Sequence, residues 1–271
     1  GYFPPVWKII KPRAFPSEER GVFVDGRIPP WYNDREGGDP MPQTQTKFGL
    51  TGNELKLIAL VTMTIDHVGL LLLPQLVILR IIGRLSMPLY AYMIAQGCRY
   101  THDRRRYFLR LAGLALACQI VYYLADRSLY QCILVTFSLS VLCISTIDRA
   151  RRGSGLGWTL AAVAVLLGEG AICELLPRWI SGFAVDYGFF GVFLTILLYY
   201  AGKKGIVPGM LLLCLSLGGL QWWSLAAVPL MLLYNGQRGS RSLGWMFYLY
   251  YPLHLAVLYG IAMLPLLTGN G

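Results

Sequence analysis

The chain is built around long apolar segments, and the first of them carries two polar residues in its interior. Residues 55–73 read LKLIALVTMTIDHVGLLLL, which is long enough to cross a bilayer as a helix. Asp66 and His67 lie well inside this segment. A charged side chain near a bilayer centre costs about 2.5–3.5 kcal/mol on insertion scales, so such residues usually face a protein interior or a wet cavity. This pattern predicts a polytopic membrane protein with a polar site between its helices.

The composition supports a membrane protein and argues against a nucleic-acid partner. Of the 271 residues, 55% are hydrophobic and only 14% are charged, whereas soluble domains carry about 25% charge. The net charge of +10 comes mostly from basic residues in short gaps between apolar segments, which is typical of cytoplasmic loops. The six cysteines lie in or beside apolar segments, and neither a CxxC pair nor zinc-ligand spacing is present. We therefore expect a lipid bilayer as the partner, no nucleic acid and no metal site.

The first 54 residues differ from the rest. They are rich in proline and charge and have no helical periodicity, which predicts an irregular or disordered tail. The chain begins with Gly1, and Met41 stands just before the apolar region. We expect Met41 to be the natural start and residues 1–40 to be upstream sequence. Residues 55–267 would then form a membrane-embedded helical domain.

From residue 55 onward, the apolar segments predict an all-α transmembrane bundle of about nine spans. The predicted spans are 55–73, 78–97, 107–125, 130–147, 157–174, 183–201, 206–219, 222–234 and 245–265. The gaps after the even-numbered spans hold eleven arginines and lysines, whereas the gaps after the odd-numbered spans carry only Arg127 and Arg178. The positive-inside rule therefore predicts a cytoplasmic N-terminus.

Asp66 and His67 are the first candidates for chemistry. Adjacent residues of a helix point in different directions, so the two side chains cannot form a self-contained dyad. His67 is suited to act as a general base, and Asp66 is suited to pair with a cation on a neighbouring helix. A purely structural, hydrogen-bonded role is the alternative for both.

Two arginines follow in the second apolar segment. Arg80 and Arg84 share one helix face by their spacing of four. Arg80 lies near the end of its span, where snorkelling would explain it, but Arg84 lies deeper and is expected to pair with Asp66. Gly83 and Pro88 flank Arg84, which predicts a close helix approach and a kink.

Further polar residues are scattered along the rest of the chain. Asp186 and Glu169 are deep acids that would relay protons or pair with the arginines. His254 lies mid-span, two residues after Pro252, and is either a structural or a site residue. The segment CRYTHDRRRYFLRL is suited to holding phosphates, or else it only sets topology and attracts anionic lipid. Its candidate phosphate ligands are Arg99, Arg104, Arg105, Arg106 and Arg110.

Three segments taken together carry a family resemblance. They are LIALVTMTIDHVG, LRIIGRLSMPLYAYMIAQGCRYTHDRRRYFLRL and FYLYYPLHL, and their order and spacing resemble the TraX family of membrane acetylases of conjugative pilin. The resemblance covers nearly all of residues 53–265 and is strongest in the first two segments. It also suggests distant kinship with membrane acyltransferases that use an intramembrane histidine.

The resemblance implies an integral membrane acetyltransferase that uses acetyl-CoA as the acyl donor. The acceptor would be an amine or hydroxyl, with a pilin N-terminus or another cell-envelope group as the candidate, and the location would be the bacterial inner membrane. Carried over to this sequence, the catalytic residues would be Asp66, His67, Arg84 and His254. Arg80, the basic segment and Asp186 would bind substrate.

Two other functions remain open from the residues alone. In a proton-coupled secondary transporter, Asp66, Glu169 and Asp186 would be the coupling groups. In a non-catalytic membrane assembly factor, Asp66, His67 and Arg84 would be replaceable as long as the protein folds.

Overall fold

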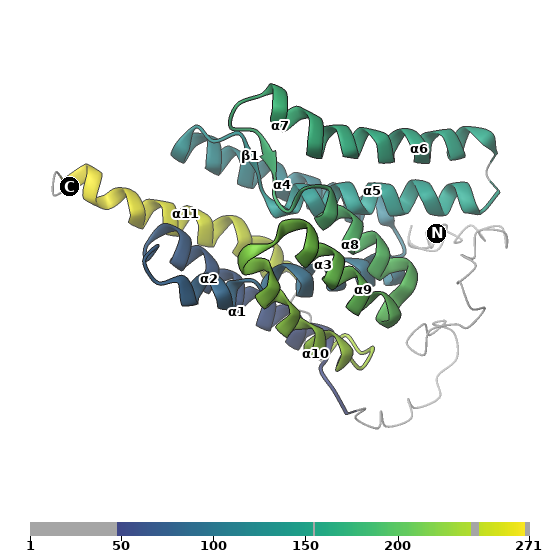
Figure 1. Ribbon diagram of the computed structural model, residues 1–271, viewed down its shortest axis with the longest axis horizontal. Coiled ribbons are helices and arrows are strands. Elements are labelled where there is room, and N and C mark those ends of the chain that lie inside the picture. Colours follow the sequence, from purple (N-terminus) through teal and green to yellow (C-terminus); the bar gives the residue numbers. More distant parts are fainter. Residues whose placement is uncertain (1–47, 154, 240–243, 269–271) are drawn as a thin grey trace, which may run out of the picture. The chain divides into compact units, whose positions relative to one another are not determined.

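The computed structural model describes residues 48–153, 155–239 and 244–268, so most of the predicted tail lies outside the described residues. The described chain forms a helix bundle, which confirms the all-α prediction apart from one pair of two-residue strands (Figure 1). The first helices are α1 (Gly52–Leu71), α2 (Val77–Gly83), α3 (Ser86–Tyr100), α4 (Arg104–Asp126) and α5 (Ile133–Arg151). They are followed by α6 (Leu156–Gly170), a π-helical turn (Ala171–Leu175), α7 (Leu176–Trp179) and α8 (Gly188–Ala201). The last are α9 (Ile206–Leu217), α10 (Ala227–Leu232) and α11 (Gly244–Thr268). Two 3₁₀ helices, η3 (Gly202–Gly205) and η4 (Gly219–Ala226), connect α8 to α9 and α9 to α10.

Helix α3 occupies the centre of the bundle and contacts α1, α5, α8 and α10. Most of its side chains are buried, including Met87, Leu89 and Tyr92. Small residues such as Ala91 and Ala95 let neighbouring helices approach closely, as is common inside membrane bundles. The core therefore lies around the segment that follows the two arginines.

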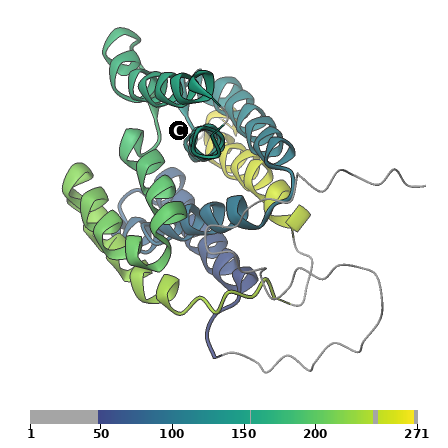
Figure 2. The same ribbon diagram turned by 90° about the vertical axis from the view of Figure 1, so that its right-hand side faces the viewer.

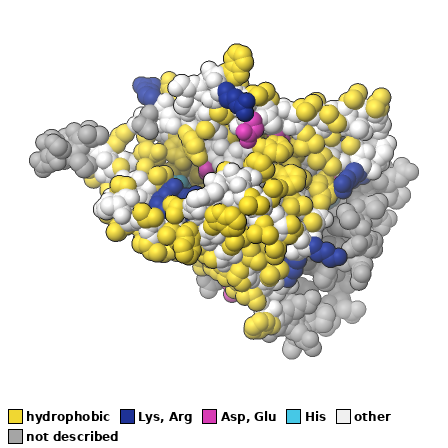
Figure 3. Space-filling model, viewed as in Figure 1, with side chains coloured by type: hydrophobic (Ala, Val, Ile, Leu, Met, Phe, Trp, Pro, Cys, Tyr) yellow, Lys and Arg dark blue, Asp and Glu magenta, His cyan; other side chains and the backbone are white. Residues whose placement is uncertain are grey.

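The outside of the bundle is apolar. Five helical stretches among the described residues are long and apolar enough to cross a membrane, namely 77–100, 104–125, 133–151, 156–179 and 188–217. Helix α6 packs along α5 at the edge of the bundle (Figures 1 and 2), and its Leu156 and Leu167 are largely exposed. Apolar side chains also cover most of the face in Figure 3. The chain is thus a multi-pass membrane protein, while the count of nine spans stays a prediction.

Several predicted spans are broken in the structure. The span predicted over 78–97 is interrupted at Arg84 and Leu85, because Pro88 has no N–H to bond the carbonyl of residue 84. By contrast, the segments predicted as 183–201 and 206–219 are separate helices, and α9 folds back along α8: a Cβ added at Gly209 would lie 2.8 Å from Leu194 Cδ1. The predicted segment 222–234 is a 3₁₀ helix followed by the short helix α10.

The bundle has two polar ends. At the basic end, the end of α3, the start of α4, and the ends of α5 and α8 meet around Asp148. At the opposite end, the strands β1 (Tyr130–Gln131) and β2 (Ala184–Val185) pair in parallel, and the Gly218–Gly219 turn lies near Arg84 and Asp186. We call this second region the cavity end. Sequence periodicity did not predict the strands, because two residues are too few to show an alternating pattern.

Candidate functional site

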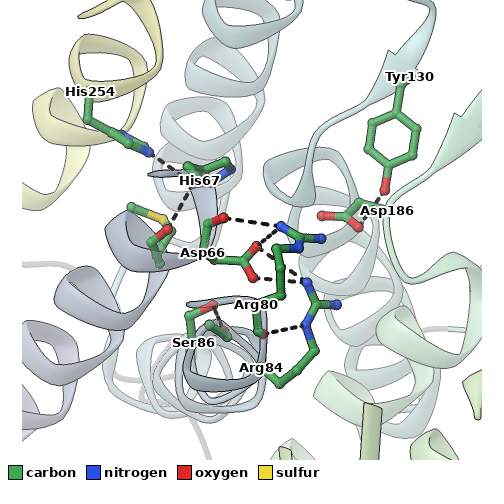
Figure 4. Close-up of polar contacts among 10 residues, drawn as sticks. Asp66, His67, Arg80, Arg84, Ser86, Tyr130, Asp186 and His254 are labelled. Carbon is green, nitrogen blue, oxygen red and sulfur yellow. Dashed lines mark hydrogen bonds and ion pairs between the residues drawn. The ribbon is translucent and has the colours of Figure 1, made fainter. Parts of the chain in front are cut away.

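Asp66 lies between two arginines of the next helix (Figure 4). Arg80 Nη1 donates to Asp66 Oδ2 at 2.7 Å, and Arg84 Nη2 donates to Asp66 Oδ1 at 3.0 Å. Arg80 also donates to the backbone oxygen of Asp66, and Arg84 Nε donates to the backbone oxygen of Arg80. The expected pairing of Asp66 with Arg84 is confirmed. Arg80 joins the same cluster, so snorkelling alone does not explain it.

Gly83 makes this ion-pair cluster possible. A Cβ built on Gly83 would lie 2.1 Å from Asp66 Oδ1, closer than two atoms can approach without displacement. Helices α1 and α2 can therefore bring the carboxylate against the guanidinium groups only with glycine at this position. The close approach predicted from Gly83 is confirmed.

His67 points away from the cluster, toward α11. Its Nδ1 lies 3.0 Å from the carbonyl oxygen of Met63 and 3.2 Å from Nε2 of His254. His254 Nδ1 lies 3.0 Å from the carbonyl oxygen of Tyr250. A carbonyl oxygen only accepts, so each Nδ1 carries the proton in the neutral imidazoles. His67 Nδ1–H is then shared between Met63 O and His254 Nε2, which leaves His67 Nε2 with a free lone pair.

Aromatic residues of α11 hold His254 in place. The ring of Tyr250 stacks on His254, with centroids 5.2 Å apart and planes 10° apart. Tyr251 packs edge-on against both histidines. The hydroxyl of Tyr250 lies 2.8 Å from Thr64 Oγ1, which ties α11 to α1 beside His67. His67 and His254 are therefore in contact, and the tyrosines fix the direction of the pair.

Asp186 lies on the other side of the arginines (Figure 4), in the turn just before α8 rather than inside a helix as predicted. Its Oδ1 accepts a 2.6 Å hydrogen bond from the hydroxyl of Tyr130, and its backbone N–H donates to Gln131 O. The strand pair therefore sets its position. Burial raises the pKa of the Asp186 carboxyl to about 6, against the lowering effects of the Tyr130 hydrogen bond and the Arg84 charge.

A cavity of about 360 Å³ lies beside Asp186 and Arg84. It is lined by Arg84, Asp186, Tyr187 and the residues from Leu217 to Gln221. Tyr187 has a φ of 59°, a backbone conformation that residues other than glycine rarely adopt, and its ring lies 5.9 Å from the Arg84 guanidinium carbon. The cavity therefore borders the ion-pair cluster directly.

The basic segment divides into two groups. Arg99 donates to carbonyl oxygens at the end of α8, and Arg104 bonds to Asp148 and to the hydroxyl of Tyr199. Arg105, Arg106 and Arg110 are exposed; Arg106 pairs with Asp103 at the start of α4. About 15 helical residues, or roughly 22 Å, separate Arg99 from Arg84. The role of these five arginines in binding phosphate stays a prediction.

Some site residues were missed from the sequence. Tyr130, Tyr187, Tyr250 and Gln221 resemble ordinary interfacial residues in the sequence, and the only available signal was their position beside predicted span ends. Glu169 was singled out, but it is buried against the thiol of Cys143, whose Sγ lies 2.9 Å from Glu169 Oε2. No ion pair links Glu169 to an arginine within the part of the chain that the structure describes.

The arrangement offers a free imidazole nitrogen beside a fixed cluster of opposite charges. Such a nitrogen can accept a proton, and the second imidazole lies in contact with the ring that carries it. The described residues contain no group of three or more His, Cys, Asp or Glu side chains that could hold a metal ion.

Comparison with known proteins gives one family and two relatives. The family model of the TraX protein matches residues 51–262. The "Probable fimbrial assembly protein FimC, serogroup H1" of Dichelobacter nodosus is 27% identical over 239 residues, covering 76% of this chain and 93% of that protein. The "Uncharacterized protein RP591" of Rickettsia prowazekii (strain Madrid E) is 55% identical over 38 residues, covering 14% of this chain and 15% of that protein. No solved structure matches.

Proposed function

Because this chain belongs to the TraX family, we propose that it is an integral membrane acetyltransferase that moves an acetyl group from acetyl-CoA to an amine or hydroxyl acceptor. The observation that carries this proposal is the free Nε2 of His67, which the contacts of Nδ1 with Met63 and His254 leave unprotonated. A base that is held in one tautomer by a fixed partner can activate a nucleophile for acyl transfer.

In the proposed reaction, His67 Nε2 takes the proton of the acceptor amine or hydroxyl as that atom attacks the thioester carbonyl. The new bond forms to the carbonyl carbon, the C–S bond breaks, and the imidazolium returns its proton to the departing CoA thiolate. His254 is a positioning residue, because its Nε2 accepts from His67 Nδ1–H and stabilises the imidazolium. Arg84, held by Asp66, supplies positive charge for the developing oxyanion.

We further propose that the basic end lies in the cytoplasm of a bacterial inner membrane, where acetyl-CoA is present. This orientation rests on the charge asymmetry of the loops. The exposed Arg105, Arg106 and Arg110 would hold the phosphates of acetyl-CoA, and the pantetheine arm would extend into the bundle. A pilin N-terminus is the candidate acceptor, since a relative that aligns over most of its length is named as a fimbrial assembly protein.

The test is acetyl transfer by the purified full chain in detergent. The protein is incubated with isotopically labelled acetyl-CoA and host membrane extract, and mass spectrometry identifies labelled products. We expect one labelled envelope protein or glycan that is absent when the enzyme is omitted. A folded protein that produces no labelled acceptor would contradict the proposal and favour a non-catalytic role in assembly.

A further inference from the structure

The cavity beside Arg84 contains a buried polar group that no described contact satisfies. Gln221, on η4, is only 4% exposed, and its side-chain Nε2 has no hydrogen-bond partner among the described residues. Gln221 is one of the residues that line the cavity. A buried amide without a partner is unfavourable, so an occupant that accepts a hydrogen bond is expected. The volume of about 360 Å³ exceeds that of a single water, whose share of liquid volume is about 30 Å³.

Two charged groups with unused atoms line the same cavity. Arg84 uses Nε and Nη2 within the ion-pair cluster, and Asp186 uses Oδ1 to accept from Tyr130. Neither Arg84 Nη1 nor Asp186 Oδ2 makes a hydrogen bond to another residue in the described ranges. The cavity therefore offers two donors, on Arg84 and Gln221, and one anionic acceptor on Asp186. Its complement is a ligand that carries both an oxyanion and an N–H-bearing ammonium.

The rim of the cavity is formed by exposed apolar side chains. Leu217 and Leu220 line the cavity and are 44% and 41% exposed. Trp222 and Trp223 follow Gln221 directly and are 43% and 55% exposed. In a membrane protein, exposed tryptophans mark the level of the lipid headgroups, and exposed leucines face the acyl chains. A ligand with a zwitterionic head and an apolar body matches both the cavity and its rim.

We propose that this cavity binds the headgroup of a phospholipid that carries a primary ammonium. The ammonium donates to Asp186 Oδ2, and the phosphate oxygens accept from Gln221 Nε2 and Arg84 Nη1. A quaternary ammonium has no N–H to donate, so a choline headgroup cannot make the same contact with Asp186. The lipid site shares Arg84 with the proposed transfer site, but lipid binding does not require acetyl transfer and is measured without acetyl-CoA.

The experiment uses the purified full chain, stripped of native lipid, and three short-chain phospholipids with the same acyl chains. Phosphatidylethanolamine carries both groups, phosphatidylcholine replaces the primary ammonium, and phosphatidylglycerol has only the phosphate. Native mass spectrometry measures the lipid retained by the protein. We expect the ethanolamine lipid to bind about tenfold more tightly than the choline lipid, as charge-assisted hydrogen bonds require. Equal retention of these two lipids by the wild-type protein would overturn the proposal.

Variants then assign the contacts. Gln221→Met removes the donor at similar size and should weaken ethanolamine and glycerol lipids alike, about fivefold. Asp186→Asn should abolish the preference for ethanolamine over choline. The control is Gln119→Met. Gln119 also has a buried side-chain atom without a partner, but it lines a different cavity, so this variant should leave lipid binding unchanged.

Thermal unfolding without lipid identifies variants that fail to fold. Gln221→Glu is a second test at that position, because its negative charge repels the lipid phosphate. Unchanged lipid binding in folded Gln221 variants would refute the site. Alaninamide serves as the competitor, because it carries an ammonium and a carbonyl oxygen but no acyl chains. Displacement of the ethanolamine lipid by an equal concentration of alaninamide would show that the cavity takes an aminoacyl group and would overturn the lipid assignment.

Discussion

The two ends of the bundle use the same kinds of side chain in different ways. At the basic end, the Asp148 carboxylate accepts hydrogen bonds from Arg104, Tyr199 and Tyr200. At the cavity end, Asp66 also accepts from two arginines, but the buried Nε2 of Gln221 has no partner among the described residues. The hydrogen bonds of Asp186 and His67 likewise use Oδ1 and Nδ1 and leave Oδ2 and Nε2 unused. Polar groups whose hydrogen bonds are all made within the protein stabilise the packing of the helices. Groups that are held in place but lack a hydrogen-bond partner are available to a ligand or a reacting atom. From this contrast we expect a structural role for the contacts around Asp148, and we propose the chemistry for the cavity end.

The largest effect is expected from removing the proposed general base, His67, at the cavity end. His67→Ala should lower acetyl transfer by about 10²- to 10⁴-fold, because general base catalysis contributes about that much. The rate is measured with labelled acetyl-CoA on purified protein. His102→Ala is the matched control, since His102 lies exposed in the loop before α4, and it should retain full activity. Wild-type rates in folded His67→Ala protein would remove His67 from the mechanism.

Replacing the central carboxylate at each end separates stability from activity. Asp66→Asn and Asp148→Asn should each lower the free energy of unfolding by about 3 kcal/mol, because the first leaves two partly buried arginines without a counter-charge and the second leaves one. At temperatures where both variants stay folded, only Asp66→Asn should also slow transfer. Denaturant unfolding and the transfer assay give the two numbers. Equal loss of activity in both variants would erase the distinction between the ends.

Steric change at Gly83 tests how closely α1 and α2 must approach. Gly83→Ala forces the new methyl against Asp66 and should cost about 1–3 kcal/mol of stability by overpacking. Gly113→Ala in α4 is the control, because no atom lies within 4 Å of its Cβ position, and it should leave stability unchanged or raise it slightly. Thermal unfolding measures both. A Gly83→Ala protein as stable as wild type would mean that the cluster can rearrange.

The pH dependence of stability tests the environment of Asp186. The charged and titratable groups around its carboxyl are Tyr130 of β1, the adjacent Tyr187, Arg80 of α2, Arg84 just after α2, and Asp66 of α1. Because burial raises its folded pKa to about 6 while an unfolded aspartate titrates near about 4, the folded protein binds the extra proton in this window. Asp186 therefore makes the wild type lose stability as pH rises from about 4 to about 6, with no further change above that range.

Asp186→Asn should remove this part of the pH profile. The free energy of unfolding of the asparagine variant relative to wild type should increase between pH 4 and pH 6 and then level off. Unfolding in matched buffers measures the difference. Parallel profiles for the two proteins would show that Asp186 titrates normally in the folded state.

The smallest effect on stability is expected at the exposed arginines of the basic end. Simultaneous replacement of Arg105, Arg106 and Arg110 by alanine should change stability by less than about 0.5 kcal/mol per site. The same variant should raise the KM for acetyl-CoA and leave kcat unchanged if these side chains hold its phosphates. An unchanged KM would leave them only a role in topology.

The sequence by itself determined the structural class of the protein and four of the candidate site residues. Apolar runs longer than a bilayer is thick specify membrane helices, and a charge inside such a run demands a partner, so Asp66, His67, Arg84 and His254 were identifiable from local pattern alone. Gly83 and Pro88 likewise predicted the close approach and the break, because their backbone constraints are local.

Only the tertiary structure decided which groups meet. The pairing of His67 with His254 joins residues far apart in sequence, and the direction of each imidazole depends on carbonyl oxygens of its own helix. The positions of Tyr130, Asp186 and Gln221 follow from a two-residue strand pair, a left-handed turn and a 3₁₀ helix, which leave no periodic trace in the sequence. The hydropathy of a segment indicates whether it is embedded in lipid. Which residues line the cavity depends instead on how the segments are aligned with one another, and this alignment is set by packing.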